Sequence, residues 1–145
     1  MATRIAVVNH DPTFLTLLQE VLSADGYEVR RIFVGIGAHE ILRAFAPAAL
    51  ILDIPHDDPA ASWQLLGIVR DDAALDPIPR VVCVERDQVR AHAAALQGHG
   101  TATLTKPFAL DDLLYLVHRM AGGPDRDRRD DRDPTRAGGV HTGAA

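Results

Sequence analysis

Aromatic and cysteine residues are scarce in this sequence. Only 5% of the 145 residues are Phe, Trp or Tyr, so the core must be built from Leu, Ile, Val and Ala. The single cysteine, Cys83, excludes an intramolecular disulfide and lies in an apolar run, where a buried free thiol is expected. No apolar run approaches the ~18–20 residues that span a bilayer. The N-terminus runs directly into a strand pattern, so we expect no signal peptide, no membrane association and a cytoplasmic location.

Lysine is almost absent as well. The chain has fifteen basic residues, and Lys106 is the one lysine among them. A lysine kept in an arginine background favours a site that requires a compact ammonium group rather than a planar guanidinium. The formal net charge of −5 argues against nucleic-acid binding, which favours a basic patch. The sequence has no glycine-rich phosphate loop and no Cys/His cluster, so we expect no enzymatic activity.

Short apolar runs alternate with helical patterns over the first 121 residues. This alternation predicts a parallel sheet covered by helices on both faces. The expected strands are residues 5–8, 27–33, 48–54, 81–84 and 101–104. The expected helices are residues 14–22, 38–45, 63–70, 89–97 and 110–120, the first of them capped by Asp11 and the last closed by Gly122.

Polar residues lie at the carboxyl ends of four of the predicted strands. They are Asn9-His10, Asp53, Glu85 and Lys106. In open parallel sheets, ligands bind at the carboxyl ends of the strands. We therefore expect these side chains to lie on one rim of the molecule.

The last part of the chain, residues 122–145, has a different composition. Residues 125–136 contain five Asp and five Arg and no apolar residue. Such a segment buries too little apolar surface to offset the entropy lost on ordering. We therefore expect a disordered tail after a folded domain of residues 1–121.

Five separated segments resemble, in order, the receiver domain of two-component response regulators. They are Ile5–Val8 followed by Asp11-Pro12, Gly26–Val29, Leu50–Ile54, Ile78-Pro79 and Leu104–Phe108. The resemblance covers about residues 3 to 121. It implies the α/β flavodoxin-like fold, a doubly wound five-stranded parallel sheet in three αβα layers.

The resemblance also implies a site. Family members receive a phosphoryl group on an aspartate from a histidine kinase, and the phosphoacceptor position falls on Asp53. The lysine that contacts the phosphoryl group falls on Lys106, and Pro107 matches a cis-proline that directs this lysine inward. An acidic pair holds Mg²⁺ in the family, and a Ser/Thr hydroxyl binds a phosphoryl oxygen.

Several of these positions depart from the family pattern. The acidic pair falls on Asn9 and His10, so a metal site would consist of Asp53, Asn9 and His10, a poor set for Mg²⁺. The hydroxyl position falls on Val84, and the switch aromatic falls on Thr103. Both switch positions are therefore degenerate, and only weak Mg²⁺ binding is expected.

Three further carboxylates lie near the expected pocket. Asp11 and the loop residues Asp57 and Asp58 are alternative metal ligands, although Asp11 and Asp58 each precede a proline and suit the start of a helix. Glu85 replaces a small residue beside the pocket and would repel an incoming phosphoryl group.

These departures leave three hypotheses open. The first is an atypical stand-alone receiver that acts by protein–protein interaction, with phosphorylation control lost or weak. The second is a slow phosphoacceptor in a two-component phosphorelay, and the third is a pseudo-receiver that binds a small ligand. The expected partners are proteins: a histidine kinase, a downstream regulator or a second copy of the chain.

Overall fold

The computed structural model describes residues 2–98, 100–122 and 140–142, the last three by their backbone alone. Strands and helices alternate along most of this chain. In chain order they are β1 (Arg4–Val8), α1 (Pro12–Ala24), β2 (Glu28–Ile32), α2 (Ala38–Phe45), β3 (Ala49–Asp53), α3 (Ala60–Asp71), β4 (Arg80–Glu85), α4 (Arg86–Ala91), α5 (Ala93–Leu96), β5 (Thr101–Lys106), α6 (Leu110–Ala121) and β6 (Val140–Thr142).

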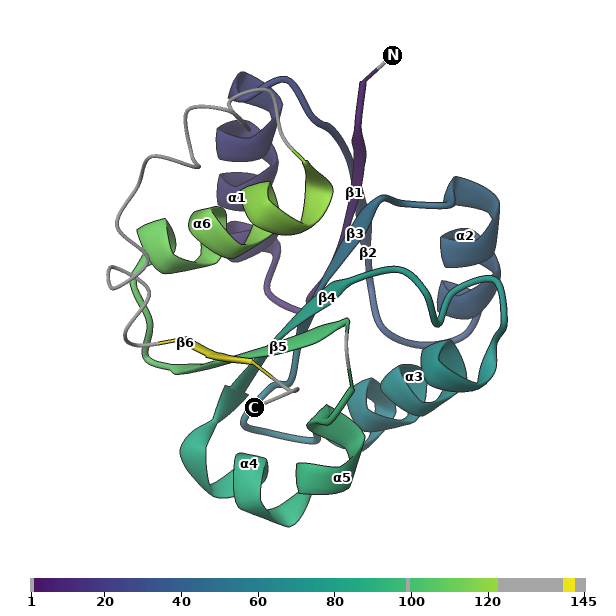
Figure 1. The fold of residues 1–145 in the computed structure, drawn as a ribbon, viewed down its shortest axis with the longest axis vertical. Coiled ribbons are helices and arrows are strands. Elements are labelled where there is room, and N and C mark those ends of the chain that lie inside the picture. The colour runs from purple at the N-terminus through teal and green to yellow at the C-terminus, as the bar shows by residue number, and fades with distance from the viewer. Residues whose placement is uncertain (1, 99, 123–139, 143–145) are drawn as a thin grey trace.

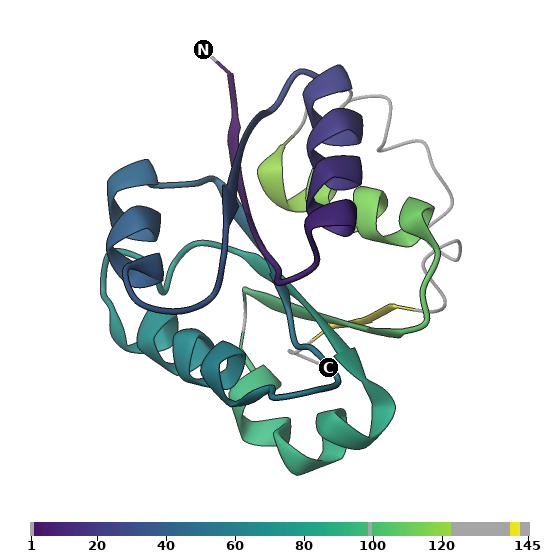
Figure 2. The same cartoon turned by 180° about the vertical axis from the view of Figure 1, so that it is seen from behind.

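The strands form one sheet in the order β2-β1-β3-β4-β5-β6. The first five are parallel, which confirms the predicted doubly wound sheet. The helices α1 and α6 cover one face, and α2 and α3 cover the other (Figures 1 and 2). The strand order changes direction at β1, because β2 lies on one side of it and β3 on the other. In doubly wound sheets, ligands bind at the carboxyl ends of the strands at such a switch point, which here are β1 and β3.

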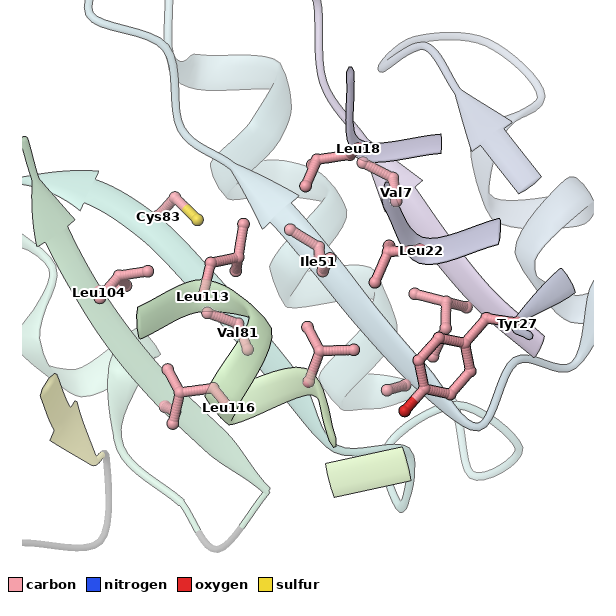
Figure 3. Packing of buried hydrophobic residues seen from close by; sticks show 14 of the residues in the cluster. Val7, Leu18, Leu22, Tyr27, Ile51, Val81, Cys83, Leu104, Leu113 and Leu116 are labelled. Carbon is pink, nitrogen blue, oxygen red and sulfur yellow. The ribbon is translucent and has the colours of Figure 1, made fainter. Parts of the chain in front are cut away.

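Two apolar clusters hold the three layers together. On one face, Leu18 and Leu22 of α1 and Leu113 and Leu116 of α6 pack around Ile51 of β3 (Figure 3). Because side chains alternate along a strand, Asp53 belongs to the same face as Ile51. All five residues of β3 are buried, which is why the strand is almost entirely apolar. Asp53, its last residue, lies at the carboxyl end of this buried strand.

The opposite cluster is also aliphatic. It joins Leu42 of α2, Leu66 of α3 and Leu96 of α5 to Leu52 and Val84 of the sheet. The prediction that aliphatic side chains form the core is confirmed by these two clusters. Among the described residues, no helix has the length and apolar character needed to cross a membrane.

The predicted cap residues Asp11 and Gly122 are confirmed, whereas α1 spans Pro12–Ala24 and is longer than the predicted residues 14–22. Asp11 caps α1, and its side chain accepts a hydrogen bond from Thr13 N at 3.0 Å. Gly122 adopts a left-handed conformation and ends α6. The helix α3 begins at Ala60, three residues before the predicted Trp63, and Asp58 has a φ of 52° and does not cap it.

The predicted alanine-rich helix of residues 89–97 is wrong in its extent and continuity. The segment forms two short helices, α4 and α5, because His92 leaves the helical conformation with φ −122° and ψ 32°. The His92 ring stacks on Trp63 of α3, with ring centroids 3.8 Å apart. Gln88 of α4 accepts a hydrogen bond from Trp63 Nε1 at 3.1 Å, so Trp63 contacts both the middle of α4 and the residue that ends it.

The C-terminal segment contributes one strand to the sheet. The sequence did not predict β6, which pairs antiparallel with residues 102–104 of β5. The expected disordered tail otherwise falls on residues 123–139 and 143–145, which lie outside the described residues. For those residues, disorder stays a prediction.

Candidate functional site

The carboxyl ends of the parallel strands bring the predicted site residues to one rim. Asp53 is the last residue of β3, and Lys106 is the last residue of β5. Glu85 ends β4 between them and is in register with Lys106. Asn9 and His10 follow β1, the other neighbour of β3. The expected convergence of these strand ends is therefore confirmed by the topology.

Asp53 and Lys106 form the centre of this rim. Lys106 Nζ lies 2.7 Å from Asp53 Oδ1 and donates a hydrogen bond to the carbonyl oxygen of Ile54 at 2.8 Å. The Asp53 side chain is 7% exposed and the Lys106 side chain 26% exposed. The Lys106–Pro107 peptide bond is cis, as the resemblance predicted. Two oxygen atoms, Asp53 Oδ1 and the carbonyl oxygen of Ile54, thus hold the Lys106 ammonium group in place.

His10 lies on the other side of the Asp53 carboxylate. Its Nδ1 atom is 3.7 Å from Asp53 Oδ2, although the imidazole is 58% exposed. Asn9 is buried, and its Oδ1 atom accepts a hydrogen bond from Asp11 N at 2.7 Å. Asn9 therefore stabilises the turn that leads into α1. Asp11 caps that helix, so its side chain serves the helix start rather than the pocket.

Sequence reasoning missed His56 as a member of the rim. His56 Nδ1 lies 2.8 Å from Glu85 Oε2, which links the loop after β3 to the end of β4. The two residues are 29 positions apart, and the sequence offers no periodic signal that pairs them. Asp57 and Asp58 on the same loop are exposed, and within the described ranges neither makes an ion pair or a side-chain hydrogen bond.

The two degenerate switch positions are both buried. Val84 is fully buried and packs in the cluster beneath α2 and α3. Thr103 is 4% exposed and lies opposite Val82 in the β4–β5 ladder. Neither residue presents an aromatic ring, and Val84 has no hydroxyl donor. Val84 belongs to the apolar cluster on the face of the sheet opposite Ile51, and the roles of Val84 and Thr103 as degenerate switch positions stay a prediction.

Cys83 lies next to Asp53 in the sheet register and is fully buried. Burial raises the pKa of its thiol above the ordinary value, and the negative charge of Asp53 raises it further, while Lys106 lowers it. A thiol in this state is a poor nucleophile. Cys83 is therefore a core residue and adds no chemistry to the rim.

The chain is similar to proteins of known type, although no family model matches it. Response regulator MprA of Mycobacterium ulcerans is 34% identical over 122 residues, which are 83% of this chain and 50% of the relative. Response regulator MprA of Mycobacterium tuberculosis H37Rv is also 34% identical, over 83% of this chain and 51% of the relative. The chain thus spans about half the length of the curated relatives it matches.

Solved structures show the same fold. A putative response regulator from Chloroflexus aurantiacus superposes with a TM-score of 0.68 at 28% identity, covering 84% of this chain and 99% of that one. The receiver domain of the sensor histidine kinase PA1611 from Pseudomonas aeruginosa, which has a magnesium ion in its active-site cleft, gives a TM-score of 0.65 at 21% identity, covering 85% and 100%. With the strand order and the Asp53–Lys106 pair, these similarities identify the folded part of this chain as a receiver domain of the response-regulator family.

Proposed function

We propose that the chain acts in signal transduction through contacts with other proteins, and that phosphorylation control through Asp53 is lost or weak. One observation carries the proposal: each oxygen of the Asp53 carboxylate already has a nitrogen atom of this chain beside it, Lys106 Nζ at 2.7 Å from Oδ1 and His10 Nδ1 at 3.7 Å from Oδ2. Two acidic residues in place of Asn9 and His10 would instead supply carboxylate oxygens that bind a divalent cation beside Asp53.

The side chains at this rim do not fit Mg²⁺ well. Magnesium prefers oxygen ligands in octahedral geometry. Asp53 is the one carboxylate at the centre, Asn9 Oδ1 already accepts a backbone hydrogen bond, and His10 offers nitrogen. No group of three or more His, Cys, Asp or Glu side chains with metal-binding geometry occurs among the described residues. We therefore infer weak Mg²⁺ binding and assign it no step in the function.

The surroundings of Asp53 also disfavour an aspartyl phosphate. Val84 cannot donate a hydrogen bond to a phosphoryl oxygen, and the lost bond to a charged group is worth about 1.5–3 kcal/mol. Glu85 adds a carboxylate at the end of β4, where its Oε2 atom lies 2.8 Å from His56 Nδ1. Phosphorylated Asp53 would thus lack both the metal and the hydroxyl that stabilise the modification.

Partner contacts are best placed on the surface formed by α4, α5, β5 and α6, as is common in receivers. Trp63 of α3 contacts Gln88 of α4 and His92 between α4 and α5, so this part of the surface is tied to α3 by contacts that do not involve Asp53. A histidine kinase, a downstream regulator or a second copy of the chain are the partner classes that we propose. We propose no catalytic activity for the chain itself.

A slow phosphoacceptor is the second candidate function. The 2.7 Å contact between Asp53 and Lys106 favours it, because these two residues are the minimum chemistry for phosphoryl transfer to a carboxylate. The magnesium-bound receiver of PA1611 shows that this fold accommodates the ion when its ligands are present.

The proposal is tested with the substitution Asp53→Asn. We expect this substitution to leave the affinity for protein partners unchanged. Bound proteins would be captured with wild-type, Asp53→Asn and Asp57→Asn chains, and the affinity of each recovered partner would be measured by calorimetry. Asp57→Asn is the matched control, since Asp57 is an exposed carboxylate outside the centre of the rim. We expect dissociation constants within about twofold of each other, because the surface is already ordered. Loss of binding in Asp53→Asn alone would contradict the proposal.

A further inference from the structure

A hollow of about 560 Å³ lies at the opposite end of the sheet from Asp53. It is bounded by the end of α3, by the loop that leads to Arg80 at the start of β4, and by Gln97, Gly98 and Gly100. Arg70 of α3 reaches α5 here through a hydrogen bond to the carbonyl oxygen of Ala94. Arg70, Asp76, Pro77, Pro79 and Arg80 provide its charged and apolar lining. Neither the resemblance nor the site around Asp53 accounts for this hollow.

Arg80 is an unusual residue to find at the start of a buried strand. Its side chain is 3% exposed, and its Nη2 atom donates hydrogen bonds to the carbonyl oxygens of Asp76 at 2.6 Å and Ile78 at 2.9 Å. Its Nη1 atom donates to Thr101 Oγ1 at 3.3 Å. Its Nε atom is buried and has no hydrogen-bond partner in the described part of the chain. The guanidinium is therefore fixed in place but incompletely satisfied.

The positive charge of Arg80 is also poorly neutralised. Its closest carboxylate is Asp76 Oδ1 at 3.9 Å, on a side chain that is 57% exposed to water. Burial lowers the pKa of Arg80, the charge of Asp76 raises it, and the charge of Arg70 lowers it again. Arginine nevertheless stays protonated in proteins, so Arg80 is a buried cation whose carboxylate partner, Asp76, lies 3.9 Å away on an exposed side chain. Such a cation is costly unless an anion approaches it.

Arg70 supplies a second cation at the mouth of the hollow. Its Nη1 atom donates to the carbonyl oxygen of Ala94 in α5 at 2.9 Å, which holds the side chain across the gap between α3 and α5. Within the described residues, Arg70 forms no ion pair with a carboxylate, so its remaining donors are available. Two arginines against one exposed aspartate make this hollow locally positive in a protein of net charge −5.

We propose that this hollow binds a small anionic molecule through Arg70, with the fixed charge of Arg80 behind it. A volume of this size matches sites for small molecules and cofactors, which occupy roughly 300–1,000 Å³. Pro77 and Pro79 give one apolar wall, and Arg70 can present two parallel donors to a phosphate or a carboxylate. The ligand chemistry is therefore a phosphate- or carboxylate-bearing metabolite. This site is separate from Asp53 and does not depend on the proposed function.

The test uses pyrophosphate and citrate as probes in two separate calorimetric titrations of the full chain. Binding of one molecule per chain is expected at about 150 mM salt, where contacts between exposed charges are largely screened. The two probes distinguish a phosphate ligand from a carboxylate ligand. No detectable binding of either probe at millimolar concentration would overturn the proposal.

Three variants locate the bound anion. Arg70→Gln should weaken binding by about tenfold or more, because it removes a charge-assisted contact. Asp76→Asn should tighten binding, because it removes the competing carboxylate. Arg90→Gln is the matched control: Arg90 is an exposed arginine of α4 that lines the different hollow beside Lys106. Equal binding by wild type and Arg70→Gln, or weakening in Arg90→Gln instead, would overturn the assignment. Circular dichroism of each variant confirms that it is folded.

Discussion

Replacement of Asn9 and His10 together by aspartate is expected to tighten Mg²⁺ binding by about tenfold or more, or at least ~1.4 kcal/mol. The double variant places two added carboxylates beside Asp53, where the wild-type chain has an amide oxygen already hydrogen-bonded to Asp11 N and an imidazole 3.7 Å away. Three carboxylates with water suit a hard divalent cation, whereas one carboxylate paired to a lysine does not. Isothermal calorimetry with MgCl₂ measures the difference directly.

His10→Ala is the control for this gain. It removes the imidazole from the neighbourhood of Asp53 without adding a carboxylate, so Mg²⁺ should still bind weakly. If the wild-type chain bound Mg²⁺ as tightly as the double aspartate variant, the inference that Asn9 and His10 weaken the metal site would be wrong.

Lys106→Met is expected to lower the free energy of unfolding by about 2–4 kcal/mol, because it leaves a nearly buried carboxylate without its close cation. Asp53 is 7% exposed, and Lys106 Nζ at 2.7 Å is its nearest charged partner. We expect a smaller loss of unfolding free energy than for a fully buried ion pair, because Lys106 is partly exposed and His10 lies beside the Asp53 carboxylate. Urea denaturation at neutral pH gives the change, provided that the slope with denaturant is unchanged.

A double-mutant cycle separates this effect from a simple loss of packing. The variant with both Asp53→Asn and Lys106→Met should be more stable than Lys106→Met alone, since no charge then remains buried and unpaired. Arg43→Met is the surface comparison: Arg43 lies 3.4 Å from Asp72 but is 57% exposed, so we expect a cost of about 0.5 kcal/mol. A cost for Lys106→Met as small as that of Arg43→Met would show that the pair at the rim is not structural.

Most of the fold could be predicted from the sequence because its strands are buried on both faces. Short, continuous apolar runs such as the one ending at Asp53 favour buried parallel strands because of their length and the helical patterns that separate them. Asp11 and Gly122 likewise mark helix ends through local chemistry alone. The break at His92 was not predictable in this way, because it coincides with a stack on Trp63 of another helix.

The same division applies to the site. Asp53 and Lys106 could be predicted because each ends a strand of a parallel sheet, and topology alone brings strand ends together. The contact between His56 and Glu85 could not, since it depends on the path of a loop. The partners of Arg80 are backbone carbonyl oxygens and a threonine hydroxyl, and no spacing in the sequence indicates them.

We propose that phosphorylation of Asp53 is lost or weak in this receiver. Intact mass spectrometry after incubation with Mg²⁺ and a small-molecule phosphodonor tests this claim most directly, with Asp53→Asn as the blank. We expect little or no phosphoryl adduct on the wild-type chain and a clear gain of adduct in the double aspartate variant at positions 9 and 10. A stable adduct on the wild-type chain, absent from Asp53→Asn, would contradict the claim and establish Asp53 as a working phosphoacceptor.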